Sequence, residues 1–137
     1  MKKLFAVLFF VCTPVLAAQY GPYMLIAPIA IDGDTIRADV PIWPGVSIDA
    51  SIRVIGVDTP ETNIACEKAR ALAAKAFTEA WINRNSPVVI SSVKPDKFGG
   101  RYVAVVTGAG GERLSAALIQ SGHGRVYNGG ARQSWCP

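Results

Sequence analysis

Two short acidic clusters in this chain could hold a divalent cation, and two nearby arginines could hold a phosphate. The first cluster is Ile31-Asp32-Gly33-Asp34-Thr35-Ile36, and the second is Asp58-Thr59-Pro60-Glu61, five residues after Arg53. A third element, Asp96-Lys97-Phe98-Gly99-Gly100-Arg101, supplies the other arginine. Carboxylate oxygens are the ligands that Ca²⁺ and Mg²⁺ prefer, and a guanidinium can bond two phosphate oxygens at once. This combination suits the cleavage of a phosphodiester beside a metal ion.

Each acidic cluster also has a purely structural interpretation. Asp32-Gly33 is typical of a hairpin turn, where Asp and Gly are common. Asp58-Thr59-Pro60-Glu61 could begin a helix, with a capping residue first and a glutamate in the first turn. Both interpretations can hold together. The arginines favour chemistry, because Arg53 interrupts an apolar strand pattern and Arg101 follows two glycines at the start of another, and a charge in a barrel strand is costly without partners.

The first eighteen residues are typical of a secretory signal peptide. Lys2 and Lys3 precede an apolar run over residues 4–11, and Ala17 and Ala18 offer a small-residue cleavage site. An uncleaved anchor is the alternative, although the run falls short of the about 20 residues that span a bilayer. We therefore predict a signal peptide at 1–18 and a mature domain at 19–137. The mature protein should be periplasmic or secreted, with no stable membrane association.

The charge of the chain is compatible with nucleic acid as a partner but does not indicate an extended basic surface that would bind it tightly. The formal net charge is +4, and loss of Lys2 and Lys3 with the signal would lower it to about +2. The sequence contains no dense run of lysines and arginines. Tight binding along a long stretch of polyanion is therefore not expected.

The cysteines predict one disulfide. Once Cys12 leaves with the signal, Cys66 and Cys136 remain, and two cysteines in an exported chain are typical of a structural bond. Such a bond would tether the C-terminus and close a loop of about 70 residues, which the loop-entropy model values at roughly 4 kcal/mol. The absence of a CxxC motif and the presence of a single histidine, His123, argue against a reactive thiol or a metal thiolate.

Hydrophobic patterns predict three strands before any helix. Residues 23–31 are apolar up to Asp32-Gly33, residues 36–40 alternate apolar and polar, and residues 48–57 form a third run. Pro41 and Pro44-Gly45 should break the second strand or turn its corner. Three successive strands favour an antiparallel meander over βαβ units.

The second half of the chain adds a long helix, two strands and a shorter helix. A helical stripe over residues 66–83 comprises Ala69, Leu72, Ala73, Ala76, Phe77, Ala80 and Trp81. Strands are expected at 88–93 and 102–107, a short helix near Leu114 with Gly122 at its end, and loop after Gly124. The order predicts a mainly β (α+β) fold, a five-stranded OB-fold Greek-key barrel with two to three helices.

The three motifs, in this order and at this spacing, resemble those of the staphylococcal nuclease (thermonuclease) family. The resemblance spans residues 30–127 and includes the intervening helix. It implies an OB-fold phosphodiesterase that requires Ca²⁺ and acts on DNA and RNA, and we expect a monomer. It also implies roles for individual residues. The calcium ligands would be the carboxylates of Asp34 and Asp58 and the backbone carbonyl of Thr59, the catalytic groups would be Arg53, Glu61 and Arg101, and Asp32 would lie behind the ligands.

Two features depart from the family pattern. Family members often have Tyr-Gly-Arg where this chain has Phe98-Gly99-Gly100-Arg101, so a phenol is lost and an extra glycine precedes the arginine. In addition, Trp43-Pro44-Gly45 lengthens the connection to the third strand. Neither departure changes a predicted metal ligand.

Two functions from different classes follow. The first is an exported, Ca²⁺-dependent endonuclease of low sequence specificity that leaves 3′-phosphate ends. The second is a catalytically inactive OB-fold module that binds single-stranded nucleic acid or an anionic glycan. A binding module has no need for a carboxylate opposite the phosphate, where it repels the ligand. The presence of Arg53, Glu61 and Arg101 together with Asp34 and Asp58 therefore favours the enzyme.

Overall fold

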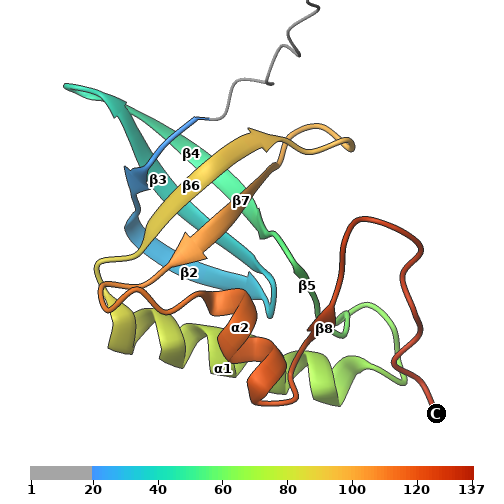
Figure 1. Ribbon diagram of the computed structural model, residues 1–137. Helices are drawn as coiled ribbons and strands as arrows, with labels where there is room; N and C mark the ends of the chain where they lie inside the picture. Colours follow the sequence, from blue (N-terminus) through green and yellow to red (C-terminus); the bar gives the residue numbers. More distant parts are fainter. Residues whose placement is uncertain (1–19) are drawn as a thin grey trace, which may run out of the picture.

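The computed structural model describes residues 20–137, which form a curled β-sheet with two helices (Figure 1). The signal peptide predicted for residues 1–18 lies outside these residues. The elements in chain order are β1 (Tyr23–Met24), β2 (Ile26–Asp32), β3 (Thr35–Trp43), β4 (Val46–Val54), β5 (Val57–Asp58), α1 (Lys68–Asn85), β6 (Val89–Pro95), β7 (Tyr102–Thr107), α2 (Leu114–Gln120) and β8 (Arg125–Val126).

Six strands form one sheet in the order β1-β6-β7-β4-β3-β2, and β5 pairs with β8 separately. All neighbours in the large sheet are antiparallel except β4 and β7. The two edge strands, β1 and β2, are consecutive in the chain and are joined only by Leu25, whose N–H bonds Val88 O at 2.9 Å. The sheet therefore curls until its edges meet at this residue, although β1 and β2 are not paired among the described strands. The predicted mainly β, OB-like fold is confirmed.

The barrel interior follows the predicted alternation. Ile36, Ala38 and Val40 point inward from β3, and Ile52 and Val54 do so from β4. Because successive side chains of a strand face opposite sides, the polar residues between them face solvent. The strand predicted at 36–40 is present as part of the longer β3, and the strand predicted at 102–107 is β7.

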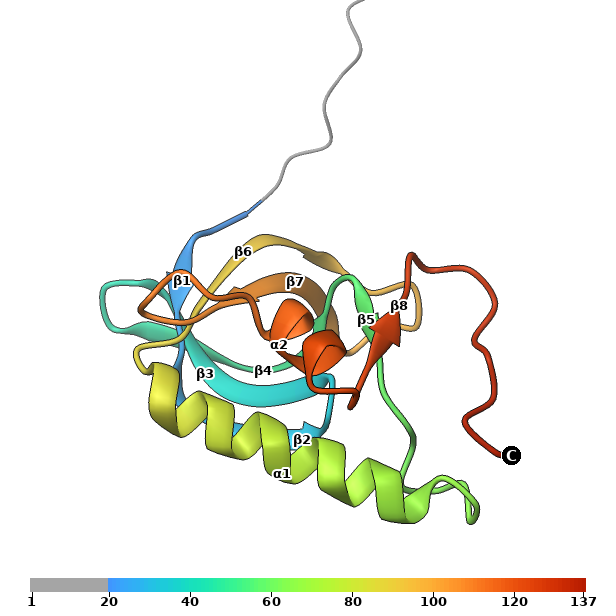
Figure 2. The ribbon, with the colours of Figure 1, turned by 60° about the horizontal axis from the view of Figure 1, so that its bottom comes forward.

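The helix predicted at 66–83 is present as α1, but only the end of its predicted buried face is confirmed: Trp81 is buried and Phe77 packs against the core, whereas Ala69, Leu72, Ala73 and Ala76 are exposed. Leu72 is half exposed, whereas the buried residues of α1 are Ala71, Ala74, Thr78, Trp81 and Ile82. Figure 2 shows why, because α1 runs directly along β2 and the turn that follows it. Close approach to that turn requires small side chains at the contact, and the hydroxyl of Thr78 donates to Gly33 O. A stripe chosen by hydrophobicity alone includes Trp81 but misses Ala71, Ala74, Thr78 and Ile82.

Three strand predictions also need correction. The run at 23–31 is not one strand, because it divides at Leu25 into β1 and β2, which are the two edges of the large sheet. The run at 48–57 is not one strand, since the chain turns at Gly56, which has a φ of +89°, and β5 leaves the large sheet to pair with β8. The stretch after Gly124 was predicted as loop, yet it contains β8. A two-residue strand carries too little periodicity to be recognised in sequence.

Pro41 was predicted to break or turn the second strand, but β3 continues through it to Trp43. Pairing of β3 with β2 extends only as far as Asp39, so within the described part of the chain Pro41 has a partner strand on one side only. A proline, which lacks an N–H donor, is tolerated at such an edge. The reversal instead falls at Pro44-Gly45.

Neither helix of residues 20–137 is long and apolar enough to cross a membrane.

Candidate functional site

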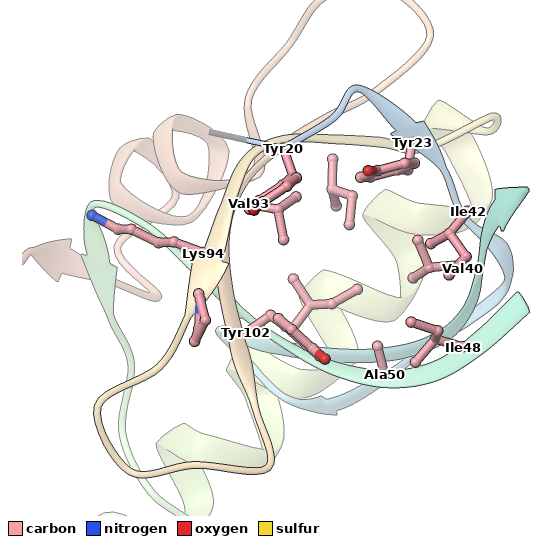
Figure 3. A pocket seen from close by; sticks show the side chains of 12 residues that line it. Tyr20, Tyr23, Val40, Ile42, Ile48, Ala50, Val93, Lys94 and Tyr102 are labelled. Carbon is pink, nitrogen blue, oxygen red and sulfur yellow. The ribbon is translucent and has the colours of Figure 1, made fainter. Parts of the chain in front are cut away.

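Two kinds of hollow open on the barrel, and only one kind carries acids. The hollow in Figure 3 has a volume of about 190 Å³ and is lined by apolar and tyrosine side chains, among them Tyr20, Tyr23 and Tyr102. Its only charged residue, Lys94, points outward in that view. A site for metal and phosphate needs charged groups, and these lie in the polar hollows beside the turn between β2 and β3.

The turn between β2 and β3 places Asp34. Asp32 pairs with Thr35, which leaves Gly33 and Asp34 as a two-residue turn. A Cβ added at Gly33 would lie 2.7 Å from Cβ of Ala74 on α1 and 2.9 Å from Oγ1 of Thr59. Glycine is therefore required for the close contact with α1, and that contact leaves Asp34 only 2% exposed.

Replacing Gly33 by alanine should lower the free energy of unfolding by about 1–3 kcal/mol, the usual cost of overpacking. Gly110→Ala is the matched control, because a Cβ at Gly110 would meet nothing within 4 Å and its φ is not positive. Urea unfolding of both variants measures the difference. Equal stabilities for the two variants would show that the contact between the turn and α1 is loose.

Asp34 is surrounded by donors and yet strongly desolvated. Its Oδ1 accepts from Arg53 Nη1 at 2.6 Å, and its Oδ2 accepts from the N–H of Thr59 at 2.8 Å. Burial raises the pKa of Asp34 above its ordinary value, although the Arg53 guanidinium and the Thr59 N–H act in the opposite direction. An additional cation beside this carboxylate would therefore stabilise its charged form.

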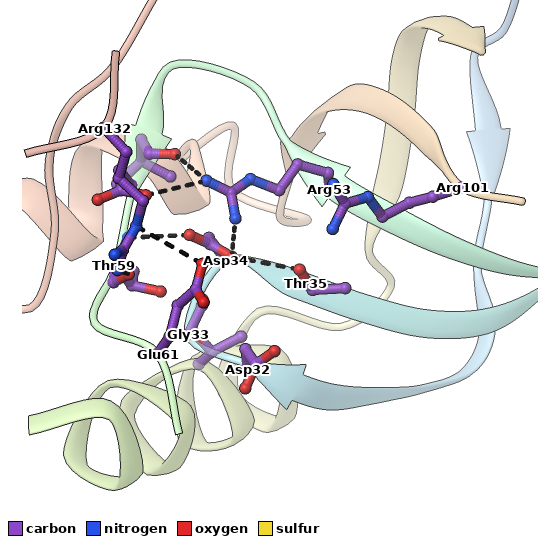
Figure 4. A network of polar contacts seen from close by, with 12 residues as sticks. Asp32, Gly33, Asp34, Thr35, Arg53, Thr59, Glu61, Arg101 and Arg132 are labelled. Atoms are coloured by element: carbon purple, nitrogen blue, oxygen red, sulfur yellow. Dashed lines mark hydrogen bonds and ion pairs between the residues drawn. The ribbon is translucent and has the colours of Figure 1, made fainter. Parts of the chain in front are cut away.

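Arg53 joins the two predicted metal carboxylates, and Figure 4 shows its guanidinium beside Asp34. On β4 it lies opposite Thr35, next to the turn that holds Asp34. Its Nη2 lies 3.3 Å from Asp58 Oδ1 and donates to Val57 O at 3.4 Å. The chain turns at Gly56 and then leads through β5 to Asp58, which is 4% exposed and lies beside Arg53. One guanidinium is thus shared by Asp34 and Asp58.

The other two predicted catalytic residues lie in the same hollows as Arg53. Glu61 and Arg101 line, with Arg53, both a groove of about 780 Å³ and a smaller polar pocket of about 210 Å³. Arg101 is held by Asp96, with 2.6 Å between Nε and Oδ2. In Figure 4 Arg101 enters from the side opposite Arg132, with Glu61 below them. The structure therefore brings all three predicted catalytic side chains to one place.

Asp32 also lies near the site but apart from Asp34. It lines the smaller pocket, and its Oδ1 accepts a bond from Thr62 Oγ1 at 3.4 Å. No contact joins it to Asp34 or Asp58 among the described residues. Its predicted place behind the ligands stays a prediction.

The structure contains the predicted disulfide, and with it a group of residues that sequence reasoning missed. Cys66 and Cys136 are bonded across 70 residues. The bond brings the C-terminal end of the chain to the start of α1. From there Arg132 and Trp135 contact Asp58 at the end of β5. A signal was available, because a bond between the two cysteines must place residues near 132–135 beside Glu67.

Glu67 anchors this C-terminal end. Its carboxylate is 1% exposed and accepts bonds from Arg132 Nη2 at 2.8 Å, from the N–H of Trp135 at 3.0 Å and from the N–H of Glu61 at 2.9 Å. The hydrogen bond from Arg132 is the largest cause that lowers the pKa of Glu67, to about 2. Glu67 therefore stays ionised in the folded protein at any ordinary pH.

Stability should fall in acid as Glu67 is protonated. The folded-state pKa is about 2, below the ordinary value of 4.5. The stabilisation is therefore fully present above about pH 4.5 and is lost as the pH falls toward about 2. Glu67→Gln should lack this slope. Urea unfolding of both proteins at several pH values gives the difference between their free energies of unfolding as a function of pH. The raised pKa of Asp34 has the opposite effect on stability, but it is common to both proteins and cancels in this difference. A difference that does not change with pH would contradict the lowered pKa of Glu67.

Comparison with known proteins identifies the family of this chain. The family model described as staphylococcal nuclease homologue matches residues 51–134, more than half of the chain. The chain belongs to the staphylococcal nuclease family. Membership indicates a nuclease-like hydrolase of the OB-fold type, with nucleic acid as the class of substrate. A search of curated proteins finds no match to the chain.

The matched region contains most of the candidate site of this staphylococcal nuclease homologue but not all of it. Arg53, Asp58, Glu61 and Arg101 fall within residues 51–134, whereas Asp34 precedes them. Asp34 reaches the site because β3 pairs with β4 in a register that sets Thr35 opposite Arg53.

Proposed function

We propose that this staphylococcal nuclease homologue is an exported, Ca²⁺-dependent endonuclease that hydrolyses DNA and RNA with low sequence specificity and leaves 3′-phosphate ends. The observation that carries the proposal is the convergence of Arg53, Glu61 and Arg101 on one groove beside two buried carboxylates, Asp34 and Asp58. Such a set combines phosphate recognition, a proton acceptor and hard oxygen donors in one place.

The charge of the site supports a divalent cation. Among the described residues, no three His, Cys, Asp or Glu side chains are arranged to hold a metal by themselves. However, the ion-pair network that joins Asp34 to Glu67 contains four carboxylates and two guanidiniums, and two negative charges remain. All the donors are hard oxygens, as Ca²⁺ prefers, so two carboxylates and the carbonyl of Thr59 suit a calcium ion that completes its shell with water.

The chain's own groups can stabilise the transition state of phosphodiester hydrolysis. Bound Ca²⁺ would polarise a phosphoryl oxygen and orient water. Arg53 and Arg101 would stabilise the extra negative charge on five-coordinate phosphorus. Ion pairs with carboxylates already hold both guanidiniums in position, so little reorganisation is needed when that charge develops. Glu61, whose side chain is 45% exposed, is free to face that water and accept or orient its proton.

The larger groove suits a nucleic acid strand. Its cationic lining residues are Arg53, Lys94, Lys97, Arg101 and Arg132. Phe98, 76% exposed, and Tyr127 also line it and offer faces on which bases can stack. Contacts to phosphates and to base faces carry little sequence information, which supports low specificity on both DNA and RNA.

The competing proposal is an inactive OB-fold module that binds single-stranded nucleic acid or an anionic glycan. The same cations and aromatic side chains favour it. Glu61 argues against it, because an exposed carboxylate in the same groove as Arg53 and Arg101 would repel a bound phosphate. We further propose that residues 1–18 are a cleaved export signal and 19–137 the nuclease domain, and that the mature protein is a periplasmic or secreted monomer.

Cleavage should require calcium. The purified mature protein should cut single-stranded and double-stranded DNA and RNA with Ca²⁺ and lose the activity with a calcium chelator. Zn²⁺ should not replace Ca²⁺, since the site offers no nitrogen or sulfur ligands among the described residues. Gel assays with end-labelled substrates measure both rate and end chemistry. Binding without cleavage in Ca²⁺ would favour the inactive module, and full activity in excess chelator would exclude calcium dependence.

A further inference from the structure

The C-terminal strap, defined as residues 128–137, lies across the proposed calcium ligands. In Figure 1 it loops outward beyond β8 and returns toward the start of α1. It has no regular secondary structure, so its position depends on side-chain contacts and on the disulfide. The charge that it carries at the site is that of Arg132.

Arg132 bonds two of the three groups proposed to bind calcium. Its Nε donates to Asp58 Oδ1 at 3.1 Å, and its Nη2 donates to the carbonyl oxygen of Thr59 at 3.0 Å. The side chain is a quarter exposed, whereas Asp58 is nearly buried. A positive group therefore already occupies the oxygens that a metal ion would take.

The rest of the strap keeps Arg132 in this position. Trp135 is buried and donates from its indole Nε1 to Asp58 Oδ2 at 3.0 Å. Its carbonyl accepts from Arg70 Nη1 at 3.0 Å, and its ring lies 3.7 Å from the guanidinium carbon of Arg125. The next residue, Cys136, is bonded to Cys66. The strap is thus tethered three to four residues beyond Arg132.

We propose that Arg132 is an internal cation that competes with Ca²⁺ for Asp58 and Thr59, so that the disulfide-tethered strap raises the calcium concentration this site requires. The inference rests on the proposed function, because it assumes that these oxygens bind calcium.

Electrostatics decides between competition and a role in positioning the ligands. A guanidinium within hydrogen-bond distance of the ligand oxygens repels a divalent ion at close range in a poorly solvated site. Arg132 also helps to hold Asp58 in place, which favours calcium binding. This benefit is smaller than the repulsion, because Arg53 and Trp135 already hold Asp58. Removal of Arg132 should therefore tighten calcium binding.

Arg132 also has other partners to which it can move. Its Nη2 lies 2.8 Å from Glu67 Oε2, and its Nε lies 3.6 Å from Glu61 Oε1. If calcium takes Asp58 and Thr59, the guanidinium can keep an ion pair with Glu67 and strengthen its contact with Glu61. Displacement does not leave an unpaired charge, so the two arrangements can exchange.

The test is a calcium-binding isotherm measured by titration calorimetry without substrate. Arg132→Gln should lower the dissociation constant for Ca²⁺ at least about tenfold relative to wild type. Arg37→Gln is the matched control, since it removes the same charge from an exposed pair with Asp49 and should leave the constant unchanged. Weaker or unchanged binding in Arg132→Gln would overturn the proposal.

A second set of variants tests the tether. Cys136→Ser should also tighten calcium binding, by less than Arg132→Gln, because a released strap has a lower effective concentration. In the Arg132→Gln background the same change should add nothing. Because Arg132→Gln leaves Glu67 without its guanidinium, Arg132→Gln with Glu67→Gln removes the pair together and should still bind calcium more tightly. Additive effects of the cysteine and arginine changes would overturn the role of the strap.

Failure of this inference can be distinguished from failure of the proposed function. If the wild type binds and is activated by Ca²⁺ but Arg132→Gln binds it no more tightly, only the competition is wrong. If neither protein binds Ca²⁺ at millimolar concentration, the calcium site and the competition are both wrong.

Discussion

Glu61→Gln is expected to lower the single-turnover rate of oligonucleotide cleavage by about 10²-fold or more, the usual scale for a lost proton acceptor. The change keeps the shape of the side chain and removes its charge. Glu61 is half exposed, and among residues 20–137 its side chain makes one long ion pair, 3.6 Å from Arg132, so the fold should tolerate the change. Substrate affinity should change far less than the rate, and removal of a carboxylate that repels phosphate should slightly strengthen binding. A labelled oligonucleotide at saturating Ca²⁺ provides the measurement.

Arg101→Lys should show a loss of similar size, because lysine keeps the charge but cannot bond two phosphate oxygens in a fixed plane. Arg53→Lys should be more severe and less simple to interpret. Arg53 bridges Asp34 and Asp58, so its loss disturbs the proposed metal ligands as well as the phosphate contact. Arg37→Lys, at an exposed ion pair away from the groove, is the control and should cut at the wild-type rate.

Asp34→Ala separates metal binding from chemistry. Its defect should appear mainly as a higher calcium requirement, whereas that of Glu61→Gln should persist at any calcium concentration. A calcium titration of the cleavage rate for each variant makes the distinction. If Glu61→Gln and Arg101→Lys both cut at wild-type rates, the assigned site is wrong even if the protein proves to be a nuclease.

Much of the fold could be predicted because it depends on local periodicity. The alternation of Ile36, Ala38 and Val40 marks one buried face, and that face is buried in the structure. The buried side of α1 could not be found in the same way. It is set by the close approach of the turn at Gly33, a contact between elements more than thirty residues apart, and small residues such as Ala74 meet that requirement better than Leu72 does.

The candidate site shows the same division between local and long-range causes. The convergence of Asp34, Arg53 and Asp58 could be expected, since acids at strand ends meet at one rim of a small barrel. Arg132 could not be placed from pattern, because it lies in a segment without periodicity and reaches Asp58 from 74 positions away. Only the pairing of Cys66 with Cys136 restricts where that segment can lie.

The disulfide should be the largest single contribution to stability that one substitution can test. It connects residues 70 positions apart, and loop entropy values such a bond at roughly 4 kcal/mol. Cys136→Ser should therefore lower the melting temperature by on the order of 15 °C for a domain of this size. Cys66→Ser and the double variant should have the same melting temperature as Cys136→Ser, because all three lose the same bond. Calorimetry or circular dichroism measures the shift.

Reduction provides the independent control. Mass spectrometry of the exported protein should show a gain of about two hydrogens on reduction, and reductant should lower the melting temperature of the wild type but not of the double cysteine variant. Cleavage at low temperature and saturating Ca²⁺ should change much less than stability, because the bond supplies no group that touches substrate. Two free thiols in protein isolated from the periplasm would contradict the bond. A loss of cleavage equal to the loss of stability would instead mean that the strap is needed to hold Asp58 during catalysis.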